Sequence, residues 1–180
     1  AAINTVLNAL QRTAVTDATL FLSDFPDKER ANEWKVSQIV ITATSSHYRF
    51  DQLKSKPDNG QSSLRKIVLC VNDRTELAAC EEAMQQGLAI VHGMSLAKDL
   101  GNLAPNICTP TYLAKQAKDL AKTHKLKASV LEEKDMEKLR MGSLLAVASG
   151  SEQPAKLIVV EYHGSGKKDN PVVLVGKGVT

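Results

Sequence analysis

The stretch that decides the fold runs from residue 75 to residue 100 and reads TELAACEEAMQQGLAIVHGMSLAKDL. Its apolar side chains recur at intervals of three and four residues, which predicts one long helix. Thr75 and Asp73 are equally placed to cap the start of this helix. The next segment, GNLAPNICTP, contains a glycine and two prolines that end the pattern. We therefore expect a boundary between two domains there, bridged by the long helix.

On both sides of this helix, short apolar runs alternate with amphipathic ones. The expected elements are an opening helix from Ile3, a strand in DATLFL, a helix from about residue 29, a strand over 66–71, a helix that Thr109 and Pro110 begin, a strand in KASVLEE, a short helix in EKDMEKLRM ending near Gly142, and strands in KLIVVEYHG and PVVLVGKG. Turns are expected at Asp24, Pro26 and Asp27 and at 57–60. This order predicts an α/β fold, with the near-continuous apolar strands 157–160 and 172–175 in a sheet covered on both faces.

The domain organisation follows from the same pattern. We expect an amino-terminal α/β domain with its linker helix over 1–104 and the opening segment of a second α/β domain over 105–180. The sequence begins without Met inside a helical pattern and ends within or just after a strand, so we expect a piece of a longer protein.

Composition sets broad limits on function. With 180 residues, 43% of them hydrophobic, the chain has the material for a core and is not a disordered segment. The net charge of +3 comes from mixed charges and does not by itself indicate nucleic acid. No run reaches the roughly 18 apolar residues of a membrane span, and no signal segment opens the chain, so a soluble cytoplasmic protein is expected. Cys70, Cys80 and Cys108 lack metal-ligand spacing, and free thiols in a reducing compartment are expected, buried at Cys70 and Cys80.

Several candidate motifs favour no specific chemistry. Neither Gly166-Lys167 nor Gly176-Lys177 has the flanking residues of a phosphate-binding loop. The four histidines stand far apart in the sequence, as expected for structural residues. The acidic cluster Glu132, Glu133, Asp135 and Glu137 alternates with lysines on a short helix, which indicates a solvated face. A basic stripe of five lysines could contact phosphates; it comprises Lys115, Lys118, Lys122, Lys125 and Lys127.

The segment VGKG at 175–178 supports two interpretations equally from its residues alone. Its glycines could shape a turn after an edge strand and leave Lys177 solvated. Alternatively, two glycines at the carboxyl end of a buried strand let the backbone approach a ligand closely.

The second half of the chain resembles the leucyl aminopeptidase (cytosol aminopeptidase) family. The resemblance is carried by AKDLGNLAPNICTPTYLAKQAKDLA, by VLEEKDMEKLRMGSLLAVASGSEQPAKLIVVEYHG and by PVVLVGKGVT, with a looser likeness around HYRFDQLKS. It implies a hydrolase with two divalent metal ions, Mn or Zn, that removes amino-terminal residues from peptides, works in the cytoplasm and assembles as a homohexamer. In that family the lysine of VGKG is a metal ligand, and this role would fall on Lys177.

The resemblance also implies what the printed chain lacks. The family's carboxylate ligands, a second lysine and an assisting arginine would follow Thr180, so no catalytic residue is expected in this segment, and the segment alone is expected to be inactive. Two other functions stay open. One is a DNA-binding or architectural role, through the amino-terminal half or through the Lys115–Lys127 stripe. The other is a purely structural role in assembling an oligomer.

Overall fold

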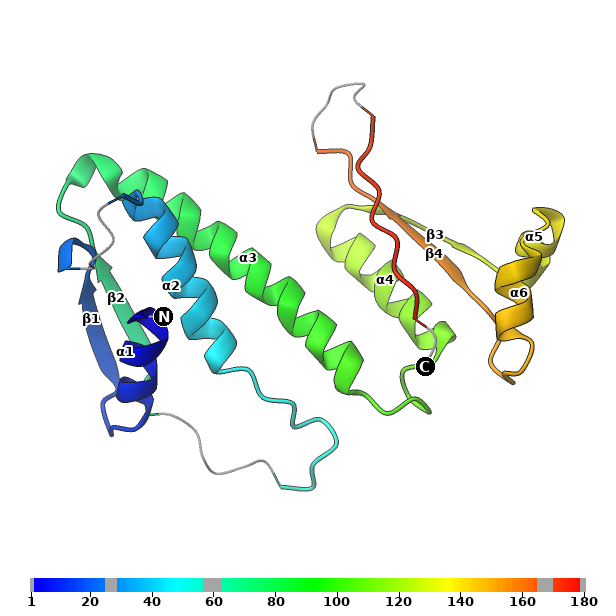
Figure 1. Cartoon of the computed structure of the whole chain (residues 1–180), viewed down its shortest axis with the longest axis horizontal. Coiled ribbons are helices and arrows are strands. Elements are labelled where there is room, and N and C mark those ends of the chain that lie inside the picture. The colour runs from blue at the N-terminus through cyan, green and yellow to red at the C-terminus, as the bar shows by residue number, and fades with distance from the viewer. Residues whose placement is uncertain (1, 25–28, 57–62, 165–169, 179–180) are drawn as a thin grey trace. The chain divides into compact units, whose positions relative to one another are not determined.

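The computed structural model describes residues 2–24, 29–56, 63–164 and 170–178 (Figure 1). In chain order its elements are α1 (Ala2–Gln11), β1 (Asp17–Phe21), the short 3-10 helix η1 (Leu22–Asp24), α2 (Asn32–Ser46), β2 (Lys66–Cys70), the 3-10 helix η2 (Arg74–Glu76), α3 (Leu77–Asn102), α4 (Pro110–His124), β3 (Lys127–Leu131), α5 (Glu133–Lys138), α6 (Gly142–Ala148) and β4 (Leu157–Glu161). The chain folds as two compact units, residues 1–102 and residues 103–180. The expected domain boundary at residue 104 lies two residues further along the chain.

The first unit is a β-α-β arrangement with two further helices. Strands β1 and β2 pair in parallel, from Asp17 opposite Lys66 to Phe21 opposite Cys70, and α2 connects them. Figure 1 shows α2 and α3 running side by side next to this sheet. Apolar side chains from both helices and from η1 make the core; its buried members are Leu22, Val36, Ile39, Cys80 and Ala83. Removing these side chains from water is the main contribution to the stability of this unit.

Helices α2 and α3 approach each other closely at Gly87. A Cβ atom at this position would lie 3.1 Å from Val40 Cγ1 and 3.3 Å from the Ser37 carbonyl oxygen. Both distances are shorter than an ordinary van der Waals contact, so a larger residue at this position would push Val40 or the α2 backbone away. Gly93 in the same helix has no atom within 4 Å of the equivalent point.

The second unit contains an antiparallel pair of strands with helices beside it. Strand β3 pairs with β4, from Lys127 opposite Glu161 to Leu131 opposite Leu157. Helix α4 packs on these strands, and α5 contacts both β3 and α6. The Met136 side chain on α5 is fully buried, and Ala114, Ala121 and Ala155 are also buried in this unit. Val159 and Val160 are exposed, so among the described residues the expectation of a sheet covered on both faces was wrong.

Most predicted elements are confirmed, and the α/β class is confirmed with them. The Thr109 hydroxyl accepts a hydrogen bond from the Tyr112 N–H at 3.2 Å, with Pro110 in the first turn, as expected for a helix start. Of the two candidate caps before α3, Thr75 and Asp73, the structure shows Asp73 in this role. Its carboxylate accepts a hydrogen bond from the Thr75 N–H at 2.8 Å. Helix α6 differs from the expectation that a helix ends near Gly142, because Gly142 begins a second helix instead. The turns expected at Pro26 and Asp27 and at 57–60 lie outside the described residues.

Candidate metal-binding segment

Lys177 lies in an extended segment, residues 170–178, that makes no ladder hydrogen bonds with the described strands. The prediction of a buried strand in PVVLVGKG was therefore wrong for this chain. The exposed fractions of Val172, Leu174 and Val175 are 91%, 93% and 93%. The physical reason is that a β-strand needs a hydrogen-bonded neighbour. Apolar and β-branched residues favour an extended backbone, but only a neighbouring strand supplies the hydrogen bonds.

The two glycines beside Lys177 leave its backbone accessible. No atom lies within 4 Å of a Cβ built at Gly176, and a Cβ at Gly178 would meet only Leu113 Cδ1, at 3.9 Å. Neither glycine has a left-handed φ, and no turn is formed at 175–178. The interpretation in which the glycines shape a turn is therefore not supported, and the glycines provide space around the lysine instead.

Lys177 is a single donor in this part of the protein. Across the ranges 2–24, 29–56, 63–164 and 170–178, no group of three or more His, Cys, Asp or Glu side chains is arranged to hold a metal ion. A pair of divalent ions needs several nitrogen and oxygen ligands, and one amine does not meet that need. Lys177 and the other described residues therefore do not form a complete site for such a pair.

Carboxylates of the acidic cluster at α5 cap this helix and bind neighbouring residues. Glu132 and Asp135 form a capping box, in which the Glu132 N–H donates to Asp135 Oδ2 at 3.2 Å. Glu133 accepts a hydrogen bond from the Ala155 N–H at 2.8 Å, and Lys156 forms an ion pair with Glu132. The Glu132 and Asp135 side chains remain 52% and 45% exposed, in agreement with a solvated face, while Glu132 and Glu133 also connect α5 to the segment before β4.

The basic stripe on α4 faces solvent along its whole length. All five lysines from Lys115 to Lys127 are exposed. Lys127 is held by Glu161, with its Nζ 3.0 and 3.2 Å from the two carboxylate oxygens. For the other four, the described part of the chain shows no ion pair within 4.0 Å. Four positive charges are thus presented on one helix and its end.

Glu161 lies at the end of the β3–β4 pair, opposite Lys127. Glu161 accepts from Lys127 and lies 3.1 Å from His163 Nε2. The hydrogen bond from Lys127, followed by the contact with His163, holds the pKa of Glu161 below its ordinary value. This arrangement stabilises a strand end, and it brings no third ligand that would bind a metal.

The cysteines and the remaining histidines have structural surroundings. All three thiols are free, Cys80 is buried, and Cys70 and Cys108 are partly buried. Burial raises the pKa of the Cys80 thiol, with smaller contributions from Glu76 and Glu33, and this favours the protonated form of the thiol. His47 Nδ1 lies 2.8 Å from the Ala43 carbonyl oxygen at the end of α2. Within the described ranges, every helix is too short or too polar to span a lipid bilayer.

Two family models match the chain, and both describe one family. The model of the cytosol aminopeptidase family, N-terminal domain, matches residues 1–57, and the model of the cytosol aminopeptidase family, catalytic domain, matches residues 95–180. The chain therefore belongs to the cytosol aminopeptidase family. The resemblance found in the sequence is confirmed by these matches.

Curated relatives agree with this assignment. The chain is 59% identical over 178 residues to a probable cytosol aminopeptidase of Nitrosomonas europaea, covering 99% of the chain and 36% of the relative. It is 60% identical over 182 residues to a probable cytosol aminopeptidase of Nitrosospira multiformis, covering 99% of the chain and 35% of the relative. The chain thus spans about a third of the length of the curated relatives it matches.

Solved structures show the same fold at lower identity. The bottromycin maturation enzyme BotP in complex with Mn matches with a TM-score of 0.72 and 22% identity, over 91% of this chain and 32% of that one. A variant of tomato leucine aminopeptidase matches with a TM-score of 0.71 and 21% identity, over 87% of this chain and 31% of that one. At these identities the likeness supports the fold alone.

Proposed function

We propose that this chain is part of a metal-dependent aminopeptidase that hydrolyses amino-terminal residues from peptides. The observation that carries the proposal is the identity of 59% and 60%, along nearly the whole chain, to probable cytosol aminopeptidases. Because the chain spans about a third of those relatives, the activity belongs to the longer protein. The segment alone is expected to be inactive.

Lys177 is, in this proposal, one ligand of a pair of divalent ions. An amine binds a cation through its nitrogen lone pair, so Lys177 must act as the neutral amine. The space around Gly176 and Gly178 supports the role, because no Cβ stands between the backbone and an approaching ion. Among the described residues, the Lys177 amine is the one ligand that this proposal assigns to the two ions, because no group of three or more His, Cys, Asp or Glu side chains is arranged to hold a metal ion there.

In this proposal the metal ions carry out the chemistry, and this chain positions one of their ligands. When bound, two divalent ions activate a water molecule and polarise a carbonyl group. Manganese is favoured by the fold relative BotP, whose structure contains Mn, and zinc is the alternative. The contribution of this chain is to present the Lys177 amine from an extended segment whose end lies against Leu113 of α4. Because the described residues contain no group of three or more His, Cys, Asp or Glu side chains arranged to hold a metal ion, the 180-residue chain should bind Mn²⁺ or Zn²⁺ only weakly.

The activity of the full-length protein tests this function. Hydrolysis of leucine p-nitroanilide should require added Mn²⁺ and should be lost on chelation. Losing an outer-sphere partner of a metal ligand costs about 10–100-fold, so Lys177→Ala, which removes a direct ligand, should cost at least about 100-fold. Lys138→Ala is the matched control, because the Lys138 side chain is 78% exposed in the same unit. Full activity of Lys177→Ala would remove the assigned role.

Peptide substrates, assembly as a homohexamer and a cytoplasmic location follow from the same proposal. The family description and the names of the relatives support the peptide substrates and the location, and the hexamer rests on the resemblance to the family alone. Sedimentation of the full-length protein tests the assembly: a mass of six chains is expected, and a monomer would contradict it.

The exposed lysine stripe favours a second candidate function, binding to DNA. If Lys115, Lys118 and Lys122 each neutralise a phosphate, the logarithm of affinity should fall with the logarithm of salt concentration with a slope of about −3. Replacing these three lysines with Glu should abolish a mobility shift with duplex DNA. An absent or salt-insensitive shift of the unmodified protein would exclude this function.

A further inference from the structure

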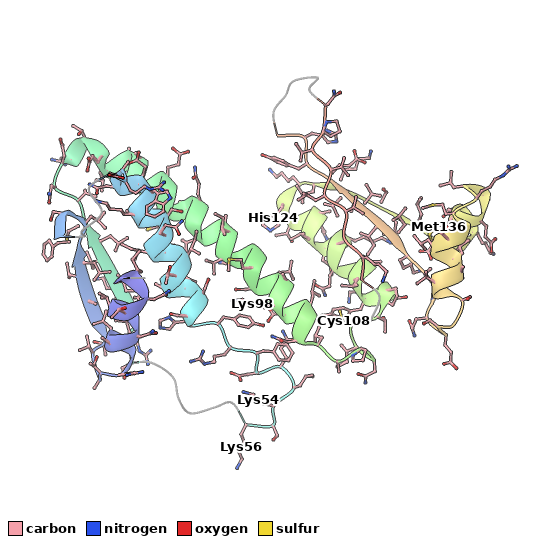
Figure 2. All side chains as sticks on the ribbon, viewed as in Figure 1. Lys54, Lys56, Lys98, Cys108, His124 and Met136 are labelled. Carbon is pink, nitrogen blue, oxygen red and sulfur yellow. The ribbon has the colours of Figure 1, made fainter. Side chains whose placement is uncertain are left out.

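The last two turns of α3 carry a cluster of side chains centred on Tyr48, from the loop after α2. The Tyr48 hydroxyl donates to Asp99 Oδ1 at 2.8 Å and accepts from Asn102 Nδ2 at 3.1 Å. The Lys98 ammonium lies 4.9 Å from the centre of the Tyr48 ring. Figure 2 shows Lys98 on the final part of α3. Both hydrogen-bonding functions of the phenol and its ring face are therefore engaged by one short stretch of helix.

This part of α3 has little other support. The buried residues of the helix are Cys80, Ala83, Gly87 and Val91, all in its first 15 positions. Helix α2, its packing partner, ends at Ser46 just before Tyr48. Gly93 and Gly101 lower the intrinsic helix stability of the remaining turns, and the position of a Cβ at each is empty. Leu96 and Leu100 in these turns are only partly buried, and a helix end with few buried contacts opens locally more readily, so a further source of stability matters here.

We propose that Tyr48 acts as a latch that keeps α3 helical as far as Asn102, so that the non-helical connection to the second unit begins at Leu103. Asp99 and Asn102 are one turn apart, and the phenol oxygen bridges them. A bridge of this kind is broken if the last turn unwinds, because the two side chains then separate. Tyr48 itself is held by its place directly after α2. The latch thus links the end of one helix to the end of the other.

The ionisation of Tyr48 agrees with this arrangement. Burial, and then the hydrogen bond to Asp99, raise the pKa of the Tyr48 phenol above its ordinary value. The charged groups that face it are Asp99 and Lys98 of α3, together with Arg49, whose guanidinium hydrogen-bonds the Tyr48 carbonyl oxygen. The neutral phenol is therefore the form that donates to Asp99, and the latch is closed at neutral pH.

Amide hydrogen exchange in the 180-residue chain tests the latch. Tyr48→Phe keeps the ring and removes both hydrogen bonds, one of them to a carboxylate. We expect the amides of 99–102 to exchange about tenfold faster, at the low end of the loss for a hydrogen bond to a charged group. The amides of 80–91 should be unaffected. The control is Tyr162→Phe, the same change at a side chain that is 81% exposed, which should alter neither region.

Two results would overturn the proposal. One is exchange at 99–102 that is unchanged by Tyr48→Phe. The other is equal acceleration at 80–91, which would mean that Tyr48 stabilises the whole unit and not the helix end. Asp99→Ala provides an independent check: in the double variant with Tyr48→Phe the two effects should not multiply, because both changes open the same bond. Multiplying effects would contradict the latch.

Discussion

The close approach of α2 and α3 at Gly87 makes a quantitative prediction about stability. Replacing Gly by Ala inside a helix stabilises it by about 1 kcal/mol. At Gly93 nothing lies within 4 Å of the new Cβ, so Gly93→Ala should stabilise the first unit by about this amount. At Gly87 the new atom would lie 3.1 Å from Val40 Cγ1 and 3.3 Å from the Ser37 oxygen. Overpacking of this kind costs about 1–3 kcal/mol, so Gly87→Ala should be neutral or destabilising by up to about 2 kcal/mol.

The decisive quantity is the difference between the two variants. The helix and the substitution are the same, so the helix-propensity gain cancels and the cost of the contact remains, about 1–3 kcal/mol. Guanidinium titration of the 180-residue chain measures it, followed by fluorescence of Trp34, which lies on α2 and is the single tryptophan of the sequence. Adding Val40→Ala to Gly87→Ala should show coupling, because Val40 holds the nearest atoms. Equal stabilisation by Gly87→Ala and Gly93→Ala would refute the close approach.

Three further outcomes follow from the second unit. Thr109→Ala removes the N-cap of α4 and should cost about 1 kcal/mol in a denaturation curve followed by circular dichroism, whereas Thr109→Ser should cost little. Met136→Ala empties a fully buried position and should cost about 2–5 kcal/mol by the same measurement. The Glu161 pKa is lowered in the folded chain, so its pairing stabilises the fold at pH values above the ordinary carboxyl pKa of about 4.3. This stabilisation is lost as the pH falls through the lower pKa of the folded state. Lys127→Ala should raise the Glu161 pKa in a carbon-13 NMR titration, and an unchanged value would contradict the pairing.

The sequence predicted those parts of the fold that depend on local pattern. The periodicity of 75–100 and the cap at Thr109 are properties of neighbouring residues, and both are confirmed. The strand in PVVLVGKG was wrong because pairing depends on a partner that the described residues do not provide. Helix α6 was missed because a glycine within the chain reads as a stop, although Gly142 begins the helix.

The functional features also differ in whether neighbouring residues or distant contacts define them. The VGKG motif is contiguous, so its resemblance to the family could be recognised, and the space around its glycines is a finding of the structure. The Tyr48 cluster joins residues 51 and 54 positions apart, and no local pattern in the sequence indicates it. Its recognition required the packing of the loop after α2 against α3.

Metal content measured together with activity tests the central claim, that Lys177 binds a metal ion, most directly. The full-length protein carrying Lys177→Arg keeps the positive charge, but an arginine does not lose its proton and cannot act as a ligand. We expect this variant to retain fewer metal ions per chain than the unmodified protein after dialysis and to lose leucine p-nitroanilide hydrolysis, while Lys138→Arg behaves as the unmodified protein. A Lys177→Arg protein with full metal content and full activity would contradict the account.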